Sequence, residues 1–164
     1  MSWEIKTLGE VCEFSNGSPH EKVISENGRF ILVNSKFVSS EGRNFKLTNE
    51  QLSPLVTGDI ALVMSDVPNG KTLAKCFLVD KDNTYTLNQR ICCIRSKIFD
   101  NKFLYYQLNR NKYFLEFDNG GNQTNLRKND ILQCPLIVPP LEEQQEIVEK
   151  LNALQEKTKL LEKV

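Results

Sequence analysis

The sequence predicts a mixed α/β (α+β) fold, in which a bent mixed sheet with short helices is followed by one long C-terminal helix of the coiled-coil type. Three observations predict it. Short apolar runs bounded by turn residues dominate the first hundred of the 164 residues, helical spacing begins only after them, and a heptad pattern follows two prolines near the end. With 40% hydrophobic and 26% charged residues, the composition is that of a soluble globular protein.

Four apolar runs are predicted to be strands. Val, Ile and Phe fit a pleated, partly buried surface, and the brevity of each run favours a bent sheet. Four Asn-Gly pairs predict tight turns, because both residues tolerate a positive φ. The predicted strands are Phe30–Val33, Asp59–Met64, Leu73–Val79 and Ile91–Ile94, and the pairs are Asn16-Gly17, Asn27-Gly28, Asn69-Gly70 and Asn119-Gly120.

The helical signal begins late in the chain. Lys102–Asn109 has apolar residues at helical spacing, and Asn125–Leu132 predicts a second short helix before a strand-like run at Cys134–Val138. Pro139 and Pro140 then impose an extended approach, and proline suits the first turn of a helix. The sequence therefore predicts a globular domain of residues 1–140 and a separate helix of residues 141–164.

The predicted C-terminal helix carries a single apolar seam. Acidic residues in its first turns favour the positive end of the helix dipole. The seam residues are Ile147, Leu151, Leu154 and Leu161, with Thr158 at the missing heptad position. This spacing favours docking against another helix, although an ordinary amphipathic helix folded back on its own domain would also show it.

Sequence motifs give no support for catalysis or metal binding. The chain lacks the glycine-rich phosphate loops, the H-E-x-x-H zinc motif and the G-x-S-x-G nucleophile motif. His20 lies in a polar loop and is predicted to be a surface histidine, and Asp59 and Asp66 are typical of turns. We therefore expect a non-catalytic protein that needs no cofactor or metal of its own.

The five cysteines are predicted to be buried, reduced thiols. They are odd in number and lie among apolar residues, and no C-x-x-C motif occurs. Cys92 and Cys93 are adjacent, so on a strand they would point to opposite faces. The N-terminus has no signal-peptide pattern and no run of eighteen apolar residues exists, so we expect a cytoplasmic protein without a membrane span.

Charge and amide-rich loops indicate where a partner could bind. Residues 84–112 hold six basic residues against one acidic residue, which predicts either a phosphate-facing surface or an ordinary solvated face. Residues 65–72 and 119–128 are loops rich in Asn, Gln, Thr, Lys and Arg, which can pair with base edges but are also common in surface loops. The residues predicted to contact a nucleic acid are Asn69, Lys71, Gln89, Arg90, Gln123, Thr124, Asn125 and Arg127.

The junction before the C-terminal helix resembles one family closely. Asn125–Leu132 followed by Pro135–Val148, which contains Pro-Pro-Leu-Glu-Glu-Gln-Gln-Glu-Ile-Val, is similar to the junction in specificity subunits of type I restriction-modification systems. Weaker similarity covers nearly the whole chain, including Trp3 with Leu8–Val11 and Phe103–Leu108. The chain resembles half of such a subunit, with one target recognition domain and one conserved helix.

The resemblance implies recognition of one half of a bipartite target in double-stranded DNA. Residues 1–140 would be the target recognition domain, and residues 141–164 the dimerisation and spacer helix that docks type I methyltransferase subunits. S-adenosylmethionine and ATP are then expected only on partner subunits, and a homodimer through antiparallel helices is expected. Two alternatives remain open: a recognition domain from a single-chain restriction-modification enzyme, and a protein-binding adaptor without a nucleic-acid role.

Overall fold

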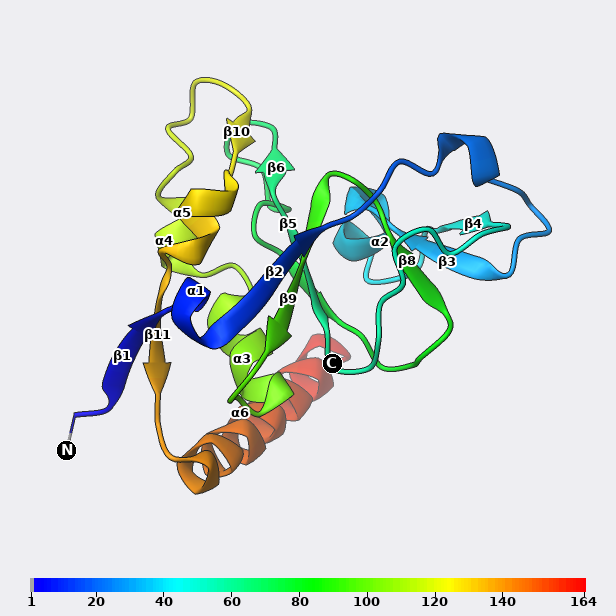
Figure 1. The fold of residues 1–164 in the computed structure, drawn as a ribbon. Coiled ribbons are helices and arrows are strands. Elements are labelled where there is room, and N and C mark those ends of the chain that lie inside the picture. Colours follow the sequence, from blue (N-terminus) through cyan, green and yellow to red (C-terminus); the bar gives the residue numbers. More distant parts are fainter. Residues whose placement is uncertain (1) are drawn as a thin grey trace.

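The computed structural model describes residues 2–164 and confirms a mixed α/β fold that ends in a long helix (Figure 1). The strands are β1 (Glu4–Thr7), β2 (Cys12–Asn16), β3 (Phe30–Val33), β4 (Lys46–Thr48), β5 (Ile60–Val63), β6 (Ser65–Asp66), β7 (Cys76–Leu78), β8 (Tyr85–Leu87), β9 (Ile91–Ser96), β10 (Thr124–Asn125) and β11 (Pro135–Val138). The helices are α1 (Leu8–Val11), the 3-10 turn η1 (Glu21–Val23), α2 (Ser35–Ser39), α3 (Asn101–Leu108), α4 (Lys112–Leu115), α5 (Lys128–Leu132) and α6 (Leu141–Glu162).

The centre of the molecule is a four-stranded antiparallel sheet in the order β2-β9-β5-β7. Every residue of β5 is buried, because both faces of the sheet are covered. Ile60 and Leu62 point into the larger hydrophobic core, whereas Ala61 and Val63 point into a smaller one on the opposite face. Two-sided burial explains why β5 reads as a continuous apolar run without alternation.

A second sheet, in the order β4-β3-β8, forms the part of the molecule around α2 (Figure 1). Strands β3 and β8 are parallel, and β3 and β4 are antiparallel. Three aromatic rings join this part to the central sheet: the ring centroid of Phe77 lies 4.8 Å from that of Phe37 and 5.0 Å from that of Tyr85. The smaller core thus connects the two sheets.

The two ends of the domain meet in the β1–β11 pair, in which Glu4 lies opposite Val138. Helix α6 follows directly and runs beneath α3 (Figure 1). The side chain of Gln144 is buried, with 2% exposure, and joins α6 to the domain. Its amide donates to the carbonyl of Pro139 (2.9 Å), and its oxygen accepts from the backbone N–H of Asp100 (2.9 Å).

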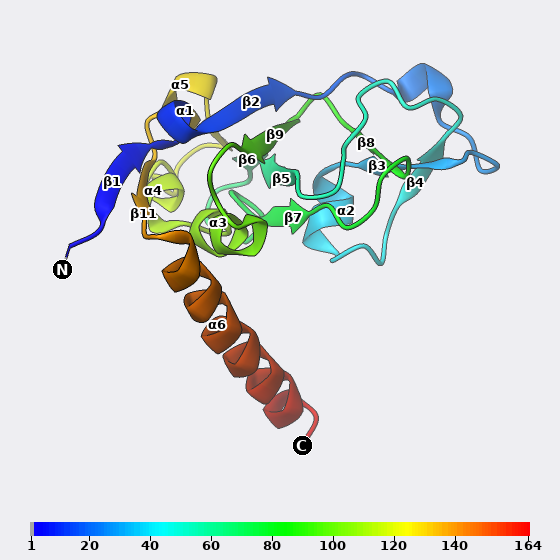
Figure 2. The same cartoon turned by 60° about the horizontal axis from the view of Figure 1, so that its bottom comes forward.

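The first half of α6 folds back on the domain, whereas docking of its second half against another helix stays a prediction. Val148 is buried against the larger core and Ile147 packs beside it, so the first turns fold back on the domain. Residues 153–164 are exposed, with Leu154 and Leu161 at 58% and 74%, and the C-terminal end of the helix projects away from the domain (Figure 2). The predicted division of the chain into a domain of residues 1–140 and a separate helix stays a prediction, because the first turns of α6 pack against that domain.

The structure corrects two local predictions and adds strands that the sequence did not indicate. The predicted helix Asn125–Leu132 begins only at Lys128, because Asn125 belongs to β10. Asn16-Gly17 is not a turn: β2 runs through Asn16, and a Cβ on Gly17 would lie 2.1 Å from the carbonyl oxygen of Asn88. Strands β2, β4 and β8 were not predicted, since they are short and contain polar residues whose pairing is set by distant parts of the chain.

His20 is not a surface residue, because it is 1% exposed and forms part of a buried hydrogen-bond network. Its Nδ1 lies 2.6 Å from the carbonyl oxygen of Ser18, which can only accept, so Nδ1 carries the proton. Nε2 then accepts from the hydroxyl of Thr86 at 2.7 Å. His20 thus binds the loop that follows β2 to strand β8, and its role is structural.

Asp59 lies at the end of a turn, as predicted, directly before β5, but its carboxylate is buried, with 1% exposure. Arg95 binds both carboxylate oxygens, at 2.7 and 2.9 Å, and the backbone N–H of Val56 donates to one of them. The hydrogen bond with Asp59 raises the pKa of the Arg95 guanidinium above its already high value. The pair therefore satisfies a carboxylate that could not be buried alone.

The five cysteines are free and buried, as predicted. Cys92 belongs to the larger core and Cys93 to the smaller, so adjacent thiols do point to opposite faces of the sheet. Burial raises the pKa of the thiols of Cys12, Cys93 and Cys134 to about 12.

Because a raised pKa keeps these thiols neutral below that value, the folded protein should not react with an aromatic disulfide reagent at pH 8, since the thiolate is the nucleophile. All five thiols should react once the chain is unfolded in guanidinium. Absorbance of the released thiol measures both states. Rapid labelling of even one thiol in the folded protein would show that the cores are more open than described.

Gln144→Ala should lower the free energy of unfolding by roughly 1–3 kcal/mol, because the N–H of Asp100 and the carbonyl of Pro139 lose their partner. Gln145→Ala is the matched control, since Gln145 is the next residue on the same helix and is exposed. Urea unfolding followed by circular dichroism measures both. Equal midpoints for the two variants would contradict the proposed anchoring of α6.

Candidate functional site

The two amide-rich loops, which the sequence separates by about fifty residues, lie side by side in the fold. Strands β6 and β10 pair antiparallel, with Thr124 opposite Asp66 and Asn125 opposite Ser65. Next to this pair, the backbone N–H of Leu126 donates to the carbonyl of Met64 at 2.7 Å. Both loops therefore extend from one end of the central sheet (Figure 1).

The register of the central sheet brings further segments to the same end. Val63, the last residue of β5, lies opposite Ile91, the first residue of β9. Asn16, the last residue of β2, lies opposite Cys92. The residues that follow β5, precede β9 and end β2 consequently meet at one place, although they are far apart in the sequence.

The first loop is organised by one carboxylate. Asp66 accepts hydrogen bonds from the backbone N–H groups of Val67 (2.8 Å), Thr72 (2.8 Å) and Leu73 (3.2 Å). A Cβ on Gly70 would lie 2.0 Å from a carboxylate oxygen of Asp66, so the loop can close around that carboxylate only with glycine at this position. The carboxylate thus replaces the regular backbone pairing that a loop lacks.

Arg110 supports the base of the first loop from the end of α3. Its guanidinium donates to the carbonyl of Leu73 at 3.0 Å, and its backbone N–H donates to the carbonyl of Ala74 at 2.8 Å. The tip of the same loop is bound to the second loop, because Asp118 accepts from the backbone N–H of Asn69 at 2.9 Å.

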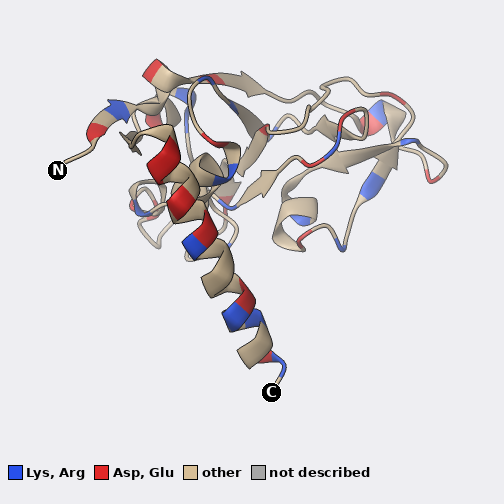
Figure 3. Cartoon of the chain, turned by 90° about the horizontal axis from the view of Figure 1, so that it is seen from below, with Lys and Arg blue, Asp and Glu red and all other residues tan. Residues whose placement is uncertain are grey.

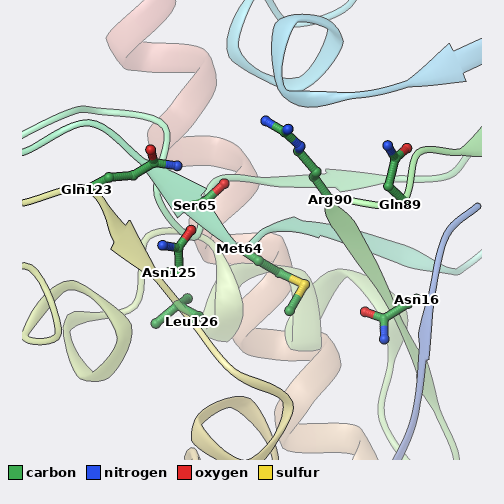
Figure 4. A pocket seen from close by; sticks show the side chains of 8 residues that line it. All are labelled: Asn16, Met64, Ser65, Gln89, Arg90, Gln123, Asn125 and Leu126. Carbon is green, nitrogen blue, oxygen red and sulfur yellow. The ribbon is translucent and has the colours of Figure 1, made fainter. Parts of the chain in front are cut away.

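Between these segments lies a pocket of about 550 Å³ (Figure 4). Four of the eight predicted contact residues line it, from two separate segments: Gln89, Arg90, Gln123 and Asn125. Sequence reasoning missed the other lining residues, which are Asn16, Met64, Ser65 and Leu126. Ser65 and Leu126 belong to the two loops that the sequence did indicate and Met64 directly precedes the first of them, but no local pattern links Asn16 to these loops.

The pocket is rich in side-chain amides and has few charges. Arg90 is its single charged residue, and Met64 and Leu126 supply apolar surface. The amide of Gln89 donates to the carboxylate of Glu21 at 3.3 Å, and hydrogen bonds from its own backbone amide and from Gln89 lower the pKa of Glu21. Such a surface can exchange directed hydrogen bonds with a ligand that offers both donors and acceptors.

The other four predicted residues do not line the pocket. Thr124 is buried at 7% exposure, because adjacent strand residues face opposite sides and Asn125 takes the outer one. Asn69 and Lys71 are exposed on the first loop, where Asn69 holds a left-handed conformation with φ of 56°. Arg127 is exposed at the start of α5.

The basic stretch of residues 84–112 does not form one positive patch. Arg95 is paired with Asp59 and Arg110 is bound to backbone carbonyls. Arg90 and Lys97 flank opposite ends of β9 and are therefore roughly 20 Å apart. Of the six basic residues in this stretch, only Arg90 lines the pocket.

Within residues 2–164, no three His, Cys, Asp or Glu side chains gather closely enough to hold a metal ion. The same residues include no helix that is both long and apolar enough to cross a membrane.

Comparison with known proteins gives one family over the whole chain. A family model described as type I restriction modification DNA specificity domain matches residues 1–164. The fold is similar to a chain from a structure on complex assembly and conformational transition of the type I R-M system, with 19% identity and a TM-score of 0.78, over 99% of this chain and 40% of that chain.

Two further solved structures share this fold. The S subunit of a type I restriction-modification system from M. genitalium has 18% identity and a TM-score of 0.69, over 99% of this chain and 41% of that chain. The HsdS subunit from Thermoanaerobacter tengcongensis has 18% identity and a TM-score of 0.70, over 99% of this chain and 39% of that chain. The chain thus spans about two fifths of the solved chains that it matches.

Proposed function

The chain belongs to the family of type I restriction modification DNA specificity domains, and on that premise we propose that it reads one half of a bipartite target in double-stranded DNA through the pocket at the end of its central sheet. The observation that carries this proposal is the convergence of Gln89, Arg90, Gln123 and Asn125 on one pocket from two segments far apart in the sequence. Four residues that the sequence predicted to contact base edges thus lie on one surface.

The chemistry of the pocket suits the edges of base pairs. Asn and Gln amides can bind adenine with two hydrogen bonds, and an Arg guanidinium can bind guanine in the same way. The apolar surface of Met64 suits contact with the methyl group of thymine. Lys71, exposed on the neighbouring loop, has the charge and reach of a phosphate contact.

The chain is proposed to supply recognition without catalysis. Type I methyltransferase subunits would dock against it and provide the S-adenosylmethionine chemistry, and ATP would be used only by other subunits of the complex. Neutral formal net charge supports dependence on these partners, because a chain without net positive charge gains little from releasing counterions on DNA.

A second copy of the chain is proposed to pair with the exposed half of α6 in an antiparallel arrangement. This half leaves Leu154, Leu160 and Leu161 exposed. Leu151 and Leu154 of α6, together with Tyr105 and Tyr106 of α3, line a groove of about 580 Å³ that a second helix could enter. Mixed charge along α6 (Figure 3) would limit repulsion between two copies.

The spacing of the two recognition domains follows from the length of this helix. Because α6 has 22 residues, it is roughly 33 Å long. That length is close to the separation of half-sites one turn of DNA apart.

Co-expression with the neighbouring methyltransferase subunit, followed by mapping of methylated adenines, tests the whole proposal. The mapped recognition sequence is expected to be split into two parts.

Replacing Gln123, Asn125 and Arg127 by Ala together should relax the methylated motif at one or more positions. The binding free energy should fall by roughly 1–3 kcal/mol for each base contact removed.

Lys71→Ala should weaken binding to all sequences alike and reduce the salt dependence of binding, because a phosphate contact carries no sequence information. Methylation mapping and DNA affinity of the complex at several salt concentrations measure these effects.

Asn122→Ala is the control for this series, because Asn122 is an exposed amide on the same loop that does not line the pocket. Its motif should match that of the parent protein. If the triple variant also kept the parent motif and rate, the second loop would be structural and recognition would lie elsewhere.

Leu154→Glu with Leu161→Glu should convert a dimer of the chain into a monomer, because each change places a charge in the proposed helix interface. Leu141→Glu is the matched control, since Leu141 is 52% exposed on the same helix but lies outside the seam. Sedimentation velocity distinguishes the two species. A double variant that still sediments as the parent dimer would reject this interface.

A further inference from the structure

The two loops that border the pocket carry carboxylates on a surface proposed to face a polyanion. Asp66 lies in the first loop and Asp118 at the start of the second. Phosphate groups repel carboxylates, so neither residue would improve DNA binding by its charge. Their hydrogen bonds suggest another role.

Asp118 connects the two loops at their tips. One of its oxygens accepts from the backbone N–H of Asn69 at 2.9 Å, across the gap between the loops. The other accepts from the backbone N–H of Gly120 at 2.8 Å, within its own loop. Asn69 and Gly120 have φ values of 56° and 76°, a region that Asn and Gly enter most easily, and this conformation presents their N–H groups to the carboxylate.

The loops are joined at two further levels below the tips. Strands β6 and β10 pair at the middle level, and the Leu126 N–H to Met64 carbonyl bond closes the base. Within the first loop, the carboxylate of Asp66 accepts hydrogen bonds from three backbone N–H groups. These bonds fix the tip of the loop relative to the base of the loop. Hydrogen bonds from N–H groups to a carboxylate are stronger than those between neutral groups.

We propose that Asp118 is a positioning residue that joins the two loops into one rigid reading unit and thereby sets the sequence discrimination of the pocket. Gln123 and Asn125 stand on the second loop and Ser65 on the first, so the distances across the pocket depend on how the loops are held together. A rigid pocket discriminates because a wrong base leaves polar groups unpaired, whereas mobile loops can adjust to it. This inference rests on the proposed DNA recognition.

Asp118→Ala and Asp118→Asn separate positioning from charge. Both variants remove the same negative charge, but Asn keeps one oxygen that can accept a backbone N–H. Glu116→Ala is the control for charge, because Glu116 is exposed two residues earlier and its ion pair is a 3.9 Å surface contact with Lys112. If only charge mattered, all three variants would strengthen binding to every DNA equally.

The first measurement uses the chain alone. Hydrogen exchange of the Leu126 amide should be faster in Asp118→Ala than in the parent, although neither Leu126 nor its partner Met64 is changed. Exchange in Glu116→Ala should equal that of the parent. Unchanged exchange at Leu126 in Asp118→Ala would overturn the coupling of the loops, and this result does not depend on any DNA activity.

The second measurement uses the complex with its methyltransferase partner and two duplexes, one with the mapped motif and one with a scrambled motif. In Asp118→Ala the ratio of the two affinities should fall about tenfold or more, the effect of losing one base contact. Asp118→Asn should stay closer to the parent ratio. A ratio in Asp118→Ala equal to that in Glu116→Ala would overturn the inference.

The two measurements also distinguish this inference from the proposed function. If the parent complex showed no preference between the duplexes, DNA recognition would be rejected and the inferred role of Asp118 in discrimination would fall with it. If the parent discriminated and Asp118→Ala did so equally well, only the role of Asp118 would be rejected.

Discussion

The burial of β5 and β9 on both faces is the constraint on which the rest of the molecule depends. Ile60 and Leu62 require one layer over the sheet, and Ala61 and Val63 require another. Because both faces are covered, only the ends of these strands are free to present polar groups. One end carries Met64, Ser65, Gln89 and Arg90, and antiparallel pairing places these residues together. The pocket is therefore a consequence of strand register.

Three aspartate side chains serve this architecture as internal hydrogen-bond acceptors. Asp59 binds Arg95 and a backbone N–H, Asp66 binds three backbone N–H groups, and Asp118 binds two. Each carboxylate stabilises a segment that lacks regular pairing. As a result, amides dominate the pocket, and selectivity for a ligand would come from directed hydrogen bonds more than from attraction between charges.

Helix α6 lies at the end of the domain opposite β6 and β10 (Figure 1). Gln144 and Val148 fix the direction in which the helix leaves the domain, while its second half stays exposed. An anchored first half lowers the conformational freedom that a partner would otherwise have to remove on binding. The pocket and the free helix can consequently engage different partners at the same time.

The sequence by itself determined the fold class, the strands β3, β5, β7 and β9 and the helices α3 and α6, because each depends on local periodicity. It also determined that Cys92 and Cys93 point in opposite directions. It also indicated half of the residues that line the pocket. Only the tertiary structure decided that His20 and Thr124 are buried, that Arg95 and Arg110 are bound internally, and that Asn16 joins Gln123 and Asn125. These outcomes depend on strand register between distant segments, and local sequence does not encode which distant residue will lie opposite.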